Sequence, residues 1–150
     1  MIKPDPIKIN KGQYLTDVLP EIPTNTILNK TLTGLGATYG ELKSGRHSII
    51  IEPNVPVIVG KMKDKKHENI LGVYEGIYAE DVLNYLEKNV GKHKFKILTT
   101  PESLRKVKDA FLEFGMNIYK ECFLLFDECQ KIVQDVFYRQ DIALPIDDFF

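Results

Sequence analysis

The sequence predicts an α/β fold, a three-layer αβα sandwich around a mostly parallel sheet. Short runs of β-branched and aromatic residues alternate along the chain with segments whose apolar residues recur at helical spacing. The run at residues 49–51 is continuously apolar, which is typical of a parallel strand covered on both faces. The 150 residues are enough for one domain with a substantial core and too few for two.

The predicted strands and helices follow one another in the order expected of βαβ units. Residues 1–22 are rich in proline and weakly periodic, so they form a predicted lead-in segment before a domain over 23–150. The predicted strands are, in chain order, 24–30, 46–52, 69–74, 95–100 and 122–126. The predicted helices are 38–44, 80–88, 101–114 and 130–138, and the lysine-rich residues 61–66 are predicted to be a solvated loop or a helix end.

Capping residues and periodicity support the helix over 101–114. Thr100 is the candidate N-cap, Pro101 suits the first helical position, and Gly115 ends the helix. The apolar residues of this segment share one face, as expected of a helix that packs on a sheet: Leu104, Val107, Phe111 and Phe114.

The composition excludes several classes of protein. Hydrophobic residues make up 43% and charged residues 27%, the proportions of an ordinary globular domain. The net charge of -1 provides no bulk attraction to nucleic acid or to an anionic membrane, so binding to either would need a local patch. No apolar run is long enough to span a bilayer, and residues 1–6 lack the apolar core of a signal peptide. We therefore expect a cytoplasmic protein without a membrane attachment.

The cysteines and histidines predict no metal site. Cys122 and Cys129 have the spacing of neither a CxxC pair nor a zinc knuckle, so both are expected to be reduced thiols. His47, His67 and His93 are scattered along the chain without partners at metal-ligand spacing.

Polar or glycine-rich segments follow several of the predicted strands. They are the glycine-rich loop, Glu52-Pro53, Thr99-Thr100 and Asp127-Glu128. In an open parallel sheet, ligands bind at the carboxyl ends of the strands. We therefore expect these four segments to meet along one edge, with the loop, Asp127 and Glu128 in one cleft.

The glycine-rich stretch is similar to a phosphate-binding loop. Gly34 and Gly36 would let the backbone wrap around phosphates, and Thr38 stands where a hydroxyl would bind magnesium. Ala37 occupies the position of the lysine that neutralises the terminal phosphates. The alternative is a structural turn between a strand and a helix.

The acidic pair after the last predicted strand suggests a second part of a nucleotide site. Asp127 would hold magnesium and Glu128 would polarise the attacking water. The alternative is that both carboxylates only cap the next helix, where the helix dipole favours negative charge.

The order of these segments resembles the first RecA-like domain of a superfamily 2 helicase or translocase, the group that contains the DEAD-box and DEAH-box proteins. Residues 33–38 are similar to the TGxGKT loop, 49–58 to motif Ia, 99–104 to motif Ib and 127–130 to motif II. The resemblance implies a RecA-like P-loop NTPase fold over about 24–135. It implies ATP binding by Thr33, Gly34, Gly36, Ala37 and Thr38, Mg²⁺ held by Thr38 and Asp127, and hydrolysis by Asp127 and Glu128.

The resemblance also implies contacts with the backbone of single-stranded nucleic acid. The residues implied are Pro53, Asn54, Thr99, Thr100 and Arg105. Lys92, Lys94 and Lys96 lie near in sequence and would add positive charge. The alternative is the solvated face of a strand, of which their spacing of two residues is typical.

Two departures from the pattern narrow the expected function. Ala37 removes a charge that stabilises the transferred phosphate, a loss worth about 3–4 kcal/mol in the transition state. The chain ends before a Ser-Ala-Thr motif and a second RecA-like domain, which we expect beyond residue 150 of a longer protein. The expectation is a helicase-like ATPase-core domain, weak or inactive alone. The alternatives are a degenerate P-loop module that binds nucleic acid or protein without hydrolysis, and an unrelated α/β domain.

Overall fold

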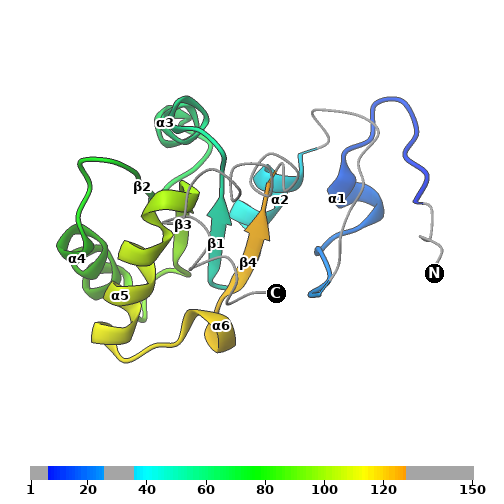
Figure 1. Ribbon diagram of the computed structural model, residues 1–150. Helices are drawn as coiled ribbons and strands as arrows, with labels where there is room; N and C mark the ends of the chain where they lie inside the picture. Colours follow the sequence, from blue (N-terminus) through cyan, green and yellow to red (C-terminus); the bar gives the residue numbers. More distant parts are fainter. Residues whose placement is uncertain (1–6, 26–35, 128–150) are drawn as a thin grey trace, which may run out of the picture. The chain divides into compact units, whose positions relative to one another are not determined.

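A computed structural model describes residues 7–25 and 36–127 (Figure 1). The chain divides into two compact units, Met1–Ser44 and Gly45–Phe150, and each is described by itself. Residues 26–30 of the predicted strand over 24–30 and the whole predicted helix over 130–138 lie outside the described residues. Within the described ranges, no helix has the length and apolar character needed to cross a bilayer.

The first unit contains two short helices, α1 (Leu15–Val18) and α2 (Ala37–Lys43). The second of these confirms the helix predicted over 38–44, shifted by one residue. Gly36, at the N-cap of α2, has the left-handed φ of 79° that favours glycine. The two helices pack closely at Gly40, because a Cβ atom there would collide with the methyl group of Thr16.

The second unit is built on a four-stranded, all-parallel sheet (Figure 1). Its strands are β1 (Ser48–Ile51), β2 (Ile70–Val73), β3 (Lys96–Thr99) and β4 (Phe123–Phe126), in the order β2-β3-β1-β4. Each strand lies inside a segment predicted to be a strand. The mostly parallel sheet predicted from the sequence is therefore confirmed for the described strands.

Helices connect the strands. They are α3 (Val55–Lys63), α4 (Ala79–Asn89), the 3₁₀ turn η1 (Pro101–Ser103) leading into α5 (Leu104–Phe114), and α6 (Ile118–Glu121). The predicted helices over 80–88 and 101–114 are confirmed. Gly115 ends α5 with a φ of 94°, and Thr100 is the N-cap of η1 without a capping hydrogen bond from its side chain. The short α6 was not predicted.

Helix α3 also corrects the sequence interpretation, which assigned no helix to residues 55–60. Its apolar residues are mostly valines, which favour strands and hide helical periodicity. Asn54 caps it, accepting a hydrogen bond from the backbone N–H of Val57 at 3.3 Å, and proline suits its first turn. The lysine-rich stretch at 61–66 therefore begins as the last turn of a helix.

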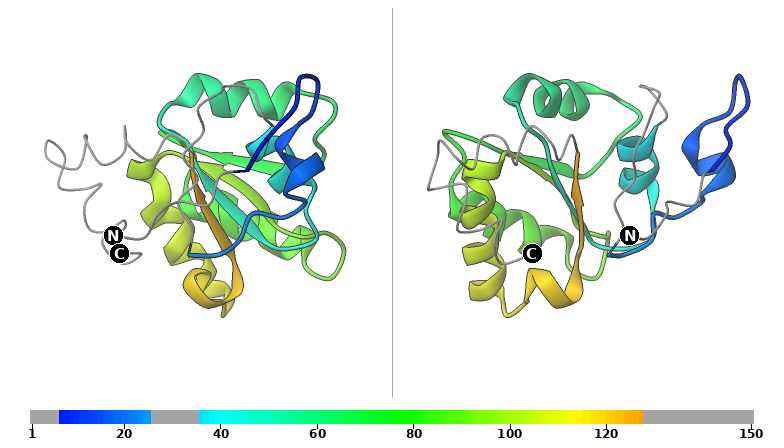
Figure 2. Two further views of the ribbon diagram at one scale, coloured as in Figure 1. Left: turned by 90° about the vertical axis from the view of Figure 1, so that its right-hand side faces the viewer. Right: turned by 45° about the vertical axis from the view of Figure 1, so that its right-hand side comes forward.

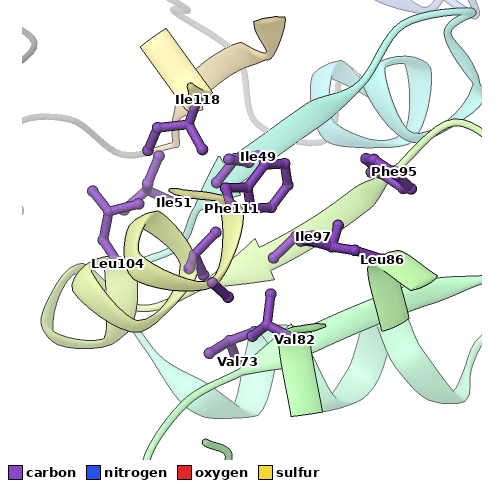
Figure 3. Close-up of a cluster of buried hydrophobic side chains, with 12 residues drawn as sticks. Ile49, Ile51, Val73, Val82, Leu86, Phe95, Ile97, Leu104, Phe111 and Ile118 are labelled. Carbon is purple, nitrogen blue, oxygen red and sulfur yellow. The ribbon is translucent and has the colours of Figure 1, made fainter. Parts of the chain in front are cut away.

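The main core lies between one face of the sheet and helices α4 and α5 (Figure 3). Ile49 and Ile51 of β1, Val73 of β2 and Ile97 of β3 point to this face because alternate residues of a strand share a face. The helices contribute Val82, Leu86, Leu104, Val107, Ala110 and Phe111. The buried face predicted for the helix over 101–114 is thus confirmed.

Helix α3 packs on the opposite face of the sheet. A Cβ atom added to Gly72 of β2 would lie on this face, 2.7 Å from Cγ2 of Ile58, and would collide with the sulfur of Met62. Helices therefore flank the sheet on both sides, as Figure 2 shows from two further directions. The second unit is a three-layer αβα sandwich.

Candidate functional site

The carboxyl ends of the four strands form one edge of the sheet (Figure 1). The strands end at paired positions, because Thr99 is paired with both Ile51 and Val73, and Ile51 with Phe126. The backbone pairing extends one residue further. Glu52 N–H donates to Thr99 O (2.9 Å), Thr100 N–H to Val73 O (3.3 Å) and Asp127 N–H to Ile51 O (3.0 Å). Three of the four segments expected to meet at this edge therefore do so.

The side chains at this edge differ in their access to solvent. Thr99 and Thr100 are buried, and the Thr99 hydroxyl donates to the Thr100 carbonyl at 3.1 Å. Pro53 is half-buried, whereas Asn54 and Arg105 are exposed. Of the five residues implied as nucleic-acid contacts, Asn54 and Arg105 are the two that are exposed, and the Asn54 side chain also caps α3.

Lys106 supports this edge and was not singled out from the sequence. Its ammonium group donates to the carbonyl oxygens of Ile77 (2.9 Å) and Tyr74 (3.3 Å), in the loop between β2 and α4. These bonds tie the first turn of α5 to the neighbouring loop. The only sequence signal is its place beside the buried Val107, at the border of the apolar face.

The described part of the expected phosphate loop lies in the first unit. Gly36 is the N-cap of α2, Ala37 is its first residue and Thr38 is buried, while Thr33 and Gly34 lie outside the described residues. Tyr14 lies beside this turn, since a Cβ atom on Gly36 would be 3.4 Å from its ring. Ala37 lines a small hollow between α2 and the segment at 15–22. Ala37, which stands where the phosphate-loop pattern has a lysine, therefore lies next to other residues of the first unit.

The predicted ATP and Mg²⁺ site stays a prediction. Thr38 belongs to the first unit and Asp127 to the second, and Glu128 lies outside the described residues. Within residues 7–25 and 36–127, no group of three or more His, Cys, Asp or Glu side chains is arranged to hold a metal ion.

The amino edge of the sheet holds the lysines that the sequence placed near the nucleic-acid contacts. Lys92 and Lys94 are exposed in the loop before β3, at the opposite end of that strand from Thr100. Lys96 is only 5% exposed, and its ammonium group donates to Arg46 O (2.6 Å) and to the Ser48 hydroxyl (3.0 Å). Lys92 and Lys94 are thus exposed to solvent, but in a loop and not on a strand, and the expectation of a solvated strand face was wrong for Lys96. None of the three lies at the strand end that carries Thr100, and their contact with nucleic acid stays a prediction.

His47, at the same amino edge, is held as a neutral imidazole. Its Nδ1 accepts a hydrogen bond from the Phe95 N–H at 2.9 Å, and its ring stacks on Phe95 with centroids 4.4 Å apart. Burial lowers the pKa of His47 from its ordinary 6.5, and the positive charges of Lys94 and Lys96 lower it further, against a smaller opposing effect of Glu121. Nδ1 can accept this bond only while it is unprotonated.

The lowered pKa of His47 predicts a loss of stability in mild acid. The unfolded chain takes up a proton as the pH falls below about 6.5, whereas the folded chain resists protonation until a lower pH. The contribution of His47 to stability is therefore full above about pH 6.5 and declines below it. Urea unfolding of the wild type and of His47→Gln across this range should show a smaller acid-dependent loss in the variant. Parallel pH profiles would contradict the assignment.

Cys122 is unsuited to nucleophilic chemistry. Burial, together with a smaller effect of the negative charge of Glu121, raises the pKa of its thiol to about 12, so the reactive thiolate is scarce at neutral pH. The free thiol of Cys122 agrees with the reduced cysteine expected from the sequence, and Cys129 lies outside the described residues.

Searches against protein-family models, curated proteins and solved structures find no match to the chain.

Proposed function

We propose that the chain is the ATPase-core domain of a helicase- or translocase-like protein, weak or inactive in isolation. The observation that carries the proposal is the gathering of Glu52, Thr100 and Asp127 at the carboxyl edge of an all-parallel sheet. Open parallel sheets bind their ligands at this edge. The proposed ligands are a nucleotide and single-stranded nucleic acid, because the four motif-like segments follow the order of the helicase motifs in the sequence.

A second candidate function is a module with the same architecture that binds nucleic acid or a protein partner without hydrolysing ATP. Ala37 favours it, because the residue adjoins the 15–22 segment in the first unit and carries no charge. Without a lysine, the terminal phosphates lose their main neutralising side chain. The two functions differ in whether a restored lysine brings back nucleotide binding.

Replacement of Ala37 by lysine is expected to raise the affinity for MgATP. The ammonium group would neutralise phosphate charge at the position where the phosphate-loop pattern places it. Ala37→Met is the matched control, since methionine has a similar length and no charge. Isothermal titration calorimetry of the whole chain with MgATP measures both. Equal affinities for the two variants, or no binding by either, would contradict the nucleotide site and leave the loop with a structural role.

A further inference from the structure

The amino edge of the sheet carries a basic surface that the proposed nucleotide site does not use. We define this amino-edge surface by five lysines in and beside the two loops that enter β2 and β3. They are Lys63, Lys65, Lys88, Lys92 and Lys94. All five are exposed, and no aspartate or glutamate occurs between residues 88 and 100.

The parallel register brings the two loops together. β2 and β3 begin at paired positions, Ile70 and Lys96, and neighbouring strands lie about 4.8 Å apart. Tyr85 of α4 bridges the two strand starts, because its hydroxyl accepts from the Lys96 N–H (3.0 Å) and donates to the Asn69 carbonyl. Lysines about thirty residues apart in sequence therefore face solvent at one end of the sheet.

Hydrogen-bonded turns hold both loops in place. In the loop before β3, Gly91 has a left-handed φ of 75°, and the N–H groups of Lys92 and His93 donate to Asn89 O at 2.9 and 3.0 Å. In the loop before β2, Asp64 accepts from the Lys66 N–H at 2.9 Å. The backbone that presents the lysines is thus ordered before any partner arrives, which lowers the entropic cost of binding.

The loop before β3 carries no carboxylate, whereas Asp64 and Glu68 are exposed in the loop before β2. Within the part of the chain that the structure describes, no ion pair joins Lys63, Lys65, Lys92 or Lys94 to a carboxylate. The positive charge of Lys94 also reaches His47, where it opposes protonation. Stabilisation of helix C-termini accounts for Lys63 and Lys88 in the last turns of α3 and α4. It does not account for Lys65, Lys92 and Lys94, which lie beyond the helix ends.

We propose that the amino-edge surface binds the phosphate backbone of nucleic acid without regard to base sequence. Lysines are compact, mobile charges suited to phosphate contacts that carry no sequence information. The exposed tyrosines of the described residues, Tyr14, Tyr39 and Tyr78, lie outside these loops, which leaves the small imidazole of His93 as the exposed ring there. The exposed apolar residues among or beside these lysines in the described part of the chain are Met62 and Val90, too few for insertion into a bilayer.

A backbone-only surface makes a specific prediction about the ligand. Duplex DNA has the higher charge density, so it should bind at least as tightly as a single strand of equal length. The surface lies at the opposite end of the strands from Asn54 and Arg105, and the proposal does not depend on nucleotide binding.

Fluorescence anisotropy with a labelled DNA duplex and the whole chain tests the proposal. Lys92→Gln/Lys94→Gln should weaken binding by roughly tenfold or more and reduce the slope of log K against log salt by about two, one for each lost phosphate contact. Lys8→Gln/Lys11→Gln is the matched control, since it removes two exposed lysines from the first unit and should leave the affinity unchanged. Wild-type affinity in the Lys92/Lys94 variant, or an equal loss in the control, would overturn the proposal.

Further measurements distinguish binding at the amino-edge surface from binding at the carboxyl edge, and DNA from other partners. Loss of DNA binding in Arg105→Gln with none in Lys92→Gln/Lys94→Gln would overturn the amino-edge surface and support contacts at the carboxyl edge. Binding to phosphatidylserine vesicles or polyglutamate, with none to DNA, would also overturn it. The calorimetry with Ala37→Lys is independent of all these outcomes, so the nucleotide site and the amino-edge surface can fail separately.

Discussion

Replacement of Phe95 by alanine is expected to lower the free energy of unfolding by about 3–5 kcal/mol, the typical cost of removing a buried aromatic side chain. The Phe95 ring is only 2% exposed. It stacks on His47 and meets the rings of Phe111 and Phe114 edge-on, with centroids 6.0 and 6.2 Å away. The substitution would leave a cavity where α5 and the start of β3 meet.

Chemical denaturation followed by circular dichroism measures this loss. Leu112→Ala is the control on α5, because that side chain is 55% exposed and its removal should change the stability by no more than about 0.5 kcal/mol. If the alanine variant does not fold, Phe95→Leu retains part of the contact and should show a smaller loss in the same direction. A loss at Phe95 no larger than that at Leu112 would contradict the central place of this ring.

Removal of the Tyr85 hydroxyl is expected to cost about 1–3 kcal/mol, the penalty for a buried backbone group that loses its partner. The hydroxyl accepts the Lys96 N–H at 3.0 Å and donates to the Asn69 carbonyl. Burial raises the pKa of Tyr85, which keeps the hydroxyl protonated and able to donate. Tyr85→Phe therefore removes the hydrogen bonds between α4 and the starts of β2 and β3 without changing the packing of the ring.

Two measurements check the Tyr85 prediction. Urea unfolding gives the change in stability, and hydrogen exchange should accelerate at the Lys96 amide in the variant. Tyr78→Phe is the control, because Tyr78 is 68% exposed and its hydroxyl should contribute little. Equal stability of Tyr85→Phe and the wild type, with unchanged exchange at Lys96, would show that the bridge is not structural.

Local patterns in the sequence predicted most elements of the second unit. The apolar runs of β1 and β4 and the capped, amphipathic α5 carry signals that need no knowledge of the rest of the chain. Helix α3 was missed because its valines favour strands locally. The helix is stabilised by its packing on the second face of the sheet, where Ile58 lies against Gly72.

The candidate site was predicted in outline and not in detail. Parallel topology alone implies that Glu52, Thr100 and Asp127 meet at one edge, and the backbone hydrogen bonds put them there. The burial of Thr99 and Thr100 depends on side chains packed from other elements, which no local pattern reports. The role of Lys106 depends likewise on a loop some thirty residues away.

The sequence by itself determined the alternation of strands and helices, because hydrophobic periodicity and capping act over a few neighbouring residues. Only the tertiary structure decided which charges lie together. Lys92, Lys94 and Lys96 are spaced alike in sequence, yet two are exposed at the amino edge and the third is buried against Arg46 and Ser48. The physical reason is that strand register and burial, which are set by contacts distant in sequence, determine the surroundings of each side chain.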